Sequence, residues 1–162
     1  MESEIMINGT PDDGAMAAFF ALGIVFVTIA IIWGIAAYLL SAFALYTMAK
    51  NDEREDAFLA FIPIINCKVQ GDLIAKKLPS FMNPEAGWKL FGVYVGIFIL
   101  SFIPIVNILT GFLSVGLGIY VMYAILERYA DNAVLFTVIH VVTAGLFFPL
   151  HLFLVRKHTP RY

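Results

Sequence analysis

Long uncharged apolar stretches alternate with short charged ones along this chain of 162 residues. Three stretches exceed the roughly 18 consecutive apolar residues that indicate a bilayer-spanning helix, and they cover residues 15–49, 90–126 and 133–155. The first stretch follows Thr10-Pro11-Asp12-Asp13, which is typical of a helix start: an N-cap hydroxyl, a proline at the first position and two carboxylates at the positive end of the helix dipole. We expect a first span over about 15–48, which must tilt, bend or project because it is longer than a bilayer requires.

The second stretch is too long to be one upright span. Its 37 residues would form a helix of about 55 Å, against a hydrocarbon core of roughly 30 Å. Pro104 interrupts the hydrogen-bond ladder near the middle, and Asn107 and Gly111 favour a turn there. We therefore expect two helices, about 88–106 and 110–126. Together with a last helix over 133–155, they predict an all-α integral membrane protein built as a four-span helical bundle.

The connection over residues 50–87 carries most of the charged residues. Pro63 is expected to break a short helix there, because proline cannot donate the backbone hydrogen bond and disfavours helix in the residue before it. Three charged side chains then recur every four residues, which predicts a charged stripe on one helix: Lys68, Asp72 and Lys76. We expect this segment to lie at the membrane surface as an interfacial helix, with a re-entrant loop as the alternative.

The placement of Lys and Arg predicts the orientation, because cytoplasmic loops carry an excess of them. Six of the ten basic residues lie between Lys50 and Lys89, and none lies in the first 49 residues. We expect a multi-pass protein of the cell membrane with its N-terminus outside and residues 50–87 cytoplasmic. Four spans then leave the C-terminal tail outside, although that tail carries Arg156, Lys157 and Arg161. A three-span alternative, with 90–126 as one broken helix, places the tail inside.

Composition excludes several functional classes. Hydrophobic residues make up 61 % of the chain, against roughly 45–50 % in soluble domains. The lack of a basic surplus argues against a nucleic-acid partner. Cys67 is the single cysteine, which excludes an internal disulfide and a multi-cysteine metal site. Hydrolase, phosphate-loop and nucleotide-binding motifs are absent from the sequence, so we expect no enzyme, no metal and no cofactor.

A six-residue block occurs twice, as FIPIIN at 61–66 and as FIPIVN at 102–107. In the structural interpretation, Pro63 and Pro104 each break a helix, and the amides of Asn66 and Asn107 cap the backbone groups that the break leaves free. In the functional interpretation, two broken helices meet and bind an ion or a small polar solute.

The order of these motifs resembles a family of small bacterial integral membrane proteins that remains uncharacterised. The resemblance covers about residues 40–162. It rests on an aromatic-X-X-Ile-Pro-X-X-Asn block, an aromatic-led apolar hairpin containing Ile-Pro-Ile-Val-Asn, and a closing helix with Phe-Phe-Pro-Leu and a terminal tyrosine. It implies a helical membrane fold and supplies no activity, ligand or catalytic residue.

All three histidines belong to the last apolar stretch and the tail that follows it. On one continuous helix, the spacings of 11 and 7 residues place His140, His151 and His158 on one stripe. Ionisable residues at membrane depth are candidates for function, and His140 and His151 are the candidates here for a ligand path or a haem or quinone site. The alternative is a hydrogen-bonded packing histidine.

Small residues favour close helix packing on the second and third spans. The expected packing positions are Gly92 and Gly96, which form a GxxxG motif, and Gly111 and Gly118. These glycines would serve either in contacts between helices of one bundle or at an oligomer interface.

Abundant packing chemistry with few polar residues at depth favours a non-enzymatic membrane protein. We expect an accessory or structural subunit that packs against itself or against a larger membrane complex, with the lipid bilayer as its surroundings. The first alternative is a channel or carrier with a path along Asn66, Asn107 and His140. The second is a redox subunit that binds haem or quinone through His140 or His151.

Overall fold

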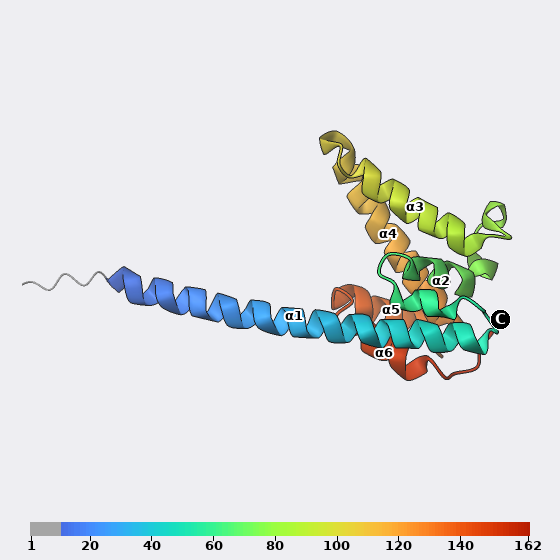
Figure 1. Cartoon of the computed structure of the whole chain (residues 1–162), viewed down its shortest axis with the longest axis horizontal. Helices are drawn as coiled ribbons and strands as arrows, with labels where there is room; N and C mark the ends of the chain where they lie inside the picture. The colour runs from blue at the N-terminus through green and yellow to red at the C-terminus, as the bar shows by residue number, and fades with distance from the viewer. Residues whose placement is uncertain (1–10) are drawn as a thin grey trace, which may run out of the picture. The chain divides into compact units, whose positions relative to one another are not determined.

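The computed structural model describes residues 11–162, and every regular element in that range is helical. The elements are α1 (Pro11–Asn51), the 3-10 helix η1 (Ala57–Phe61), α2 (Asn66–Leu73), the 3-10 helices η2 (Ala75–Lys77) and η3 (Ser80–Met82), α3 (Ala86–Leu100), α4 (Pro104–Tyr129), α5 (Ala133–Val142) and α6 (Phe148–Val155) (Figure 1). The all-α class is therefore confirmed for the described residues. The expected N-cap, Thr10, lies outside them.

The chain divides into two units, one reaching to Ala36 and the other formed by residues 37–162. In the first unit, α1 is an uninterrupted apolar helix whose side chains from Gly14 to Ile32 are all exposed. A helix that is apolar on all sides requires apolar surroundings. By length and composition two helices could cross a membrane, Gly14–Asn51 and Pro104–Tyr129.

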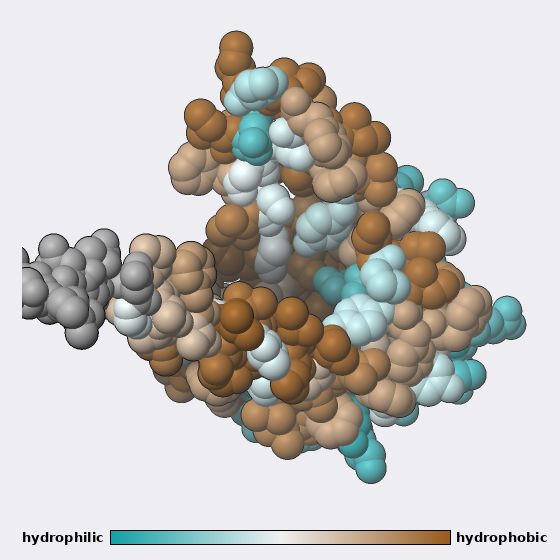
Figure 2. Space-filling model, turned by 60° about the vertical axis from the view of Figure 1, so that its left-hand side comes forward, coloured by the Kyte–Doolittle hydropathy of each residue, from teal (hydrophilic) through white to brown (hydrophobic). Residues whose placement is uncertain are grey.

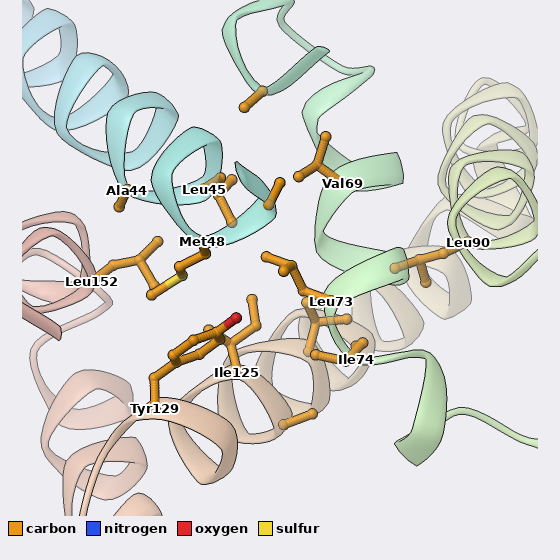
Figure 3. Close-up of a cluster of buried hydrophobic side chains, with 14 of the residues drawn as sticks. Ala44, Leu45, Met48, Val69, Leu73, Ile74, Leu90, Ile125, Tyr129 and Leu152 are labelled. Carbon is orange, nitrogen blue, oxygen red and sulfur yellow. The ribbon is translucent and has the colours of Figure 1, made fainter. Parts of the chain in front are cut away.

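One hydrophobic core holds the second unit together. Leu45 and Met48 from the end of α1 meet Leu73 of α2, Ile125 of α4 and Leu152 of α6 (Figure 3). Each of these side chains is at most 1 % exposed, so their burial stabilises this end by about 1.5–3 kcal/mol per side chain. Packing in this core therefore holds residues that are far apart in the sequence close together at one end of the second unit.

Helix α2 is a central element of this unit. It makes its most extensive contact with α3, and Cys67, Val69 and Leu73 are buried. The expected charged stripe is buried in part as well, because Lys68 is only 5 % exposed and forms ion pairs with Asp56 and Asp72. The segment thus contains a short helix packed against the rest of the second unit with its charges paired, and its expected position at the membrane surface stays a prediction.

The long apolar stretch does break near its internal proline, but at a different place from the expected one. Helix α3 ends at Leu100 and α4 begins at Pro104, so the expected helices 88–106 and 110–126 become Ala86–Leu100 and Pro104–Tyr129. The reason is that proline suits the first turn of a helix, where no backbone donor is needed. Asn107 and Gly111 therefore lie inside α4, and the two helices run side by side from a three-residue turn (Figure 1).

The expected last span, 133–155, is not one helix. It is interrupted after Val142, where Ala144 and Gly145 adopt positive φ angles of 50° and 72°. Helix α6 then returns along α5, because His140 Nε2 and His151 Nδ1 lie 2.8 Å apart. Eleven residues of straight helix would separate them by about 16 Å along the axis. The segment is a helical hairpin, and its ends lie close together.

Candidate functional site

The two FIPxxN blocks share part of their local structure. Ile62 and Ile103, which precede the prolines, are both extended, with φ/ψ angles of −98°/116° and −89°/115°. A new helix follows each proline, and the backbone N–H of each asparagine donates to the isoleucine carbonyl four residues earlier, at 3.0 Å for Asn66 and 2.8 Å for Asn107. The restarts differ after the proline, because Ile64 has a φ angle of 71° and α2 begins only at Asn66, whereas α4 begins at Pro104 itself.

The asparagine side chains do not cap these restarts. The residues at the N-cap positions are Ile65 for α2 and Ile103 for α4, and no side-chain cap hydrogen bond is formed at either. The backbone bonds described above satisfy the donors instead. The structural interpretation thus holds for the prolines, whereas the amides remain available for other contacts.

Both asparagines line cavities, and the two cavities share Tyr94 of α3. The first, of about 350 Å³, lies between α3 and α4 and is lined by Tyr94, Ile97, Phe98, Ser101, Asn107, Thr110, Gly111 and Ser114. The second, of about 320 Å³, is lined by Ile64, Asn66, Cys67, Gln70 and Tyr94. We call the two together the α3 groove. Pale and teal residues lie among brown ones on the α3–α4 lobe and in the hollow below it (Figure 2).

The polar groups of the α3 groove are all neutral. Ser101 donates to the Phe98 carbonyl and Thr110 to the Asn107 carbonyl, which leaves their oxygens free to accept. No hydrogen bond of the Asn107 or Ser114 side chain is found among the described residues. The thiol of Cys67 is tied to the Ile64 carbonyl, and burial raises its pKa, so it stays neutral as well.

His140 and His151 form a pair, although not through the expected stripe. The hairpin places their rings 5.1 Å apart between Phe136 and Phe148, while His158 lies elsewhere, with Nδ1 3.0 Å from the Tyr129 carbonyl. His140 is 3 % exposed and its Nδ1 has no partner within the described part of the chain. Two imidazole nitrogens on one metal ion, each at about 2.0–2.1 Å, would be roughly 3.3 Å apart. The observed 2.8 Å is a hydrogen-bond distance, and no third His, Cys, Asp or Glu joins the pair in residues 11–162.

The expected packing glycines all face open space. A Cβ placed on Gly92, Gly96, Gly111 or Gly118 would have no neighbour within 4 Å. The close helix approach in this chain is made by Gly71 of α2 and Gly87 of α3, where a Cβ on Gly71 would lie 2.8 Å from Gly87 Cα. Sequence reasoning missed this pair because the two glycines belong to different helices and share no motif.

Charged residues gather at one end of the second unit. Arg128 of α4 binds Asp52 at 2.7 Å and also the Leu73 carbonyl, and Lys77 binds Glu127 at 3.0 Å. The end of α1, the connection and the end of α4 are thereby joined.

The C-terminal tail returns to this same end. The Arg161 N–H donates to the Arg128 carbonyl at 3.0 Å, and the Tyr162 hydroxyl donates to the Ala124 carbonyl at 3.0 Å. Burial and the nearby Glu127 carboxylate raise the pKa of Tyr162 to about 12, so its phenol stays protonated and able to donate. The tail is therefore held beside the segment that precedes α5.

Comparisons of the chain with protein-family models, with curated proteins and with solved structures found no match. The family resemblance inferred from the motifs therefore stays a prediction.

Proposed function

We propose that the chain is a non-enzymatic membrane subunit whose N-terminus is outside the cell and whose Lys and Arg residues all lie on the cytoplasmic side. In this arrangement α1 crosses the bilayer. The α3–α4 and α5–α6 hairpins enter it from the cytoplasmic side and return. This replaces the four-span arrangement expected from the sequence.

The α5–α6 hairpin supports this topology through its size. Helix α5 has 10 residues, which corresponds to about 15 Å, half of a roughly 30 Å hydrocarbon core. Both ends of the hairpin lie beside Arg128 and Tyr129. A segment that enters the bilayer and returns to the same side does not cross it.

The α3–α4 hairpin supports it through its tip. Helix α3 extends about 22 Å, and the turn is uncharged, with Phe102 72 % and Ile105 89 % exposed. Such a tip fits an apolar environment short of the far interface.

The positive-inside rule supports the same topology. The ten basic residues lie in segments 50–89, 128 and 156–161, and ion pairs and a backbone bond join these three segments. The conflict between the basic tail and a four-span arrangement disappears, because the tail stays on the cytoplasmic side.

The subunit role rests on the GxxxG face of α3. Gly92 and Gly96 expose backbone that meets no side chain within the described chain, and small residues at this spacing allow another transmembrane helix to approach closely. We propose that this face binds a helix of a second copy or of a larger membrane complex.

The association is tested by resonance energy transfer between two differently labelled copies in vesicles and by sedimentation after mild extraction from native membranes. We expect an assembly larger than the monomer, which Gly92→Leu disrupts. Gly116→Leu is the matched control, because Gly116 is equally open and lies outside the GxxxG motif. A monomer in both measurements would refute the subunit role.

A further inference from the structure

The α3 groove combines hydrogen-bonding groups with an apolar rim. Tyr94 and Ser101 lie two turns apart on α3, so the α3–α4 part extends about 10 Å along the helix. Phe98 and Ile108, on either side, are 64 % and 71 % exposed. The groove is thus a polar strip between surfaces that suit acyl chains.

In the proposed topology the α3–α4 part of the groove lies at hydrocarbon depth, where unpaired polar groups are costly. The amide of Asn107 and the hydroxyls of Ser114 and Tyr94 can donate hydrogen bonds, and phosphodiester and ester oxygens accept them. Within the described residues no carboxylate lines the groove to repel a phosphate, and no basic group lines it to select a net anionic lipid.

We propose that the α3–α4 part of the α3 groove binds the headgroup and glycerol region of a zwitterionic phospholipid and draws it below the interface, with the acyl chains on the apolar rim. The inference rests on the proposed membrane embedding.

The test uses the full chain in phosphatidylcholine vesicles with two photoreactive lipids. One carries a diazirine on the choline headgroup and the other at the end of an acyl chain, and the labelled peptides are identified by mass spectrometry. We expect the headgroup probe to label residues 101–114, a depth at which an ordinary lipid presents only its chains. Gly111→Leu places a side chain in the groove from a position where an added Cβ meets open space, and Ser114→Ala removes one donor. Each should lower headgroup labelling about threefold to tenfold.

Gly92→Leu is the control, because Gly92 is open but does not line the groove. It should leave headgroup labelling unchanged even where it abolishes association. Headgroup labelling that is absent from 101–114, or unchanged in both groove variants, would overturn the proposal. Protein–protein adducts at 101–114 in place of lipid adducts would overturn it too, because a partner helix would then fill the groove. If the acyl-chain probe also fails to label the exposed apolar residues, the membrane embedding itself is wrong.

Discussion

At the scale of single residues, prolines and glycines determine where this chain turns and where it packs. The sequence predicts the breaks at Pro63 and Pro104, because the missing backbone donor is a local property. It does not predict the contact of Gly71 with Gly87, since that depends on how α2 and α3 meet. Local backbone properties therefore predict where the helices break, whereas tertiary packing decides which glycines cannot be replaced by a larger residue.

Gly87→Ala should destabilise the second unit by about 1–3 kcal/mol. The added Cβ would collide with the Lys68 carbonyl and with Asp72, whose Oδ1 accepts the Gly87 N–H at 3.1 Å. Unfolding in mild detergent, followed by circular dichroism, measures the loss. Gly92→Ala adds the same methyl group in open space and should change stability little. Equal effects of the two substitutions would contradict the packing described here.

At the scale of elements, hydropathy predicts helical segments better than their connections. Hydropathy identifies the apolar stretch 133–155. It cannot show that the stretch folds back, because a lipid-exposed span and a helical hairpin both consist of apolar residues. A signal was nevertheless present: Gly145 follows α5 and Pro149 lies in the first turn of α6, the usual order of a helix stop and a helix start. The histidine pair follows from this turn, which explains why a stripe on a straight helix was the wrong geometry.

Arg128→Ala should destabilise the second unit by about 3–5 kcal/mol, because it leaves Asp52 almost buried without its partner. The two side chains are only 10 % and 11 % exposed. Arg161→Ala is the control: its partner Asp131 is exposed, so the cost should stay below about 1 kcal/mol. Denaturant titration in mild detergent compares the variants. A loss for Arg128→Ala no larger than the control would mean that the ion pair does not join α1 to α4.

At the scale of the whole molecule, the second unit has a charged end and two apolar hairpins. The sequence places most of the basic residues in the connection 50–87, and four spans would put the tail on the opposite side from it. Hydrogen bonds from the Arg161 N–H and the Tyr162 hydroxyl to carbonyls of α4 hold the tail at α4, which supports the proposed re-entrant hairpin instead. The same contacts make the proposed topology testable without knowledge of any partner.

The most direct test is the accessibility of cysteines placed on either side of the α5–α6 hairpin. Cys67→Ala removes the buried native thiol, and Asp131→Cys and Lys157→Cys are then introduced one at a time. A membrane-impermeant maleimide should label neither position in intact cells and both after permeabilisation. Labelling of only one of the two in intact cells would show that residues 133–155 cross the bilayer, and would contradict the re-entrant hairpin.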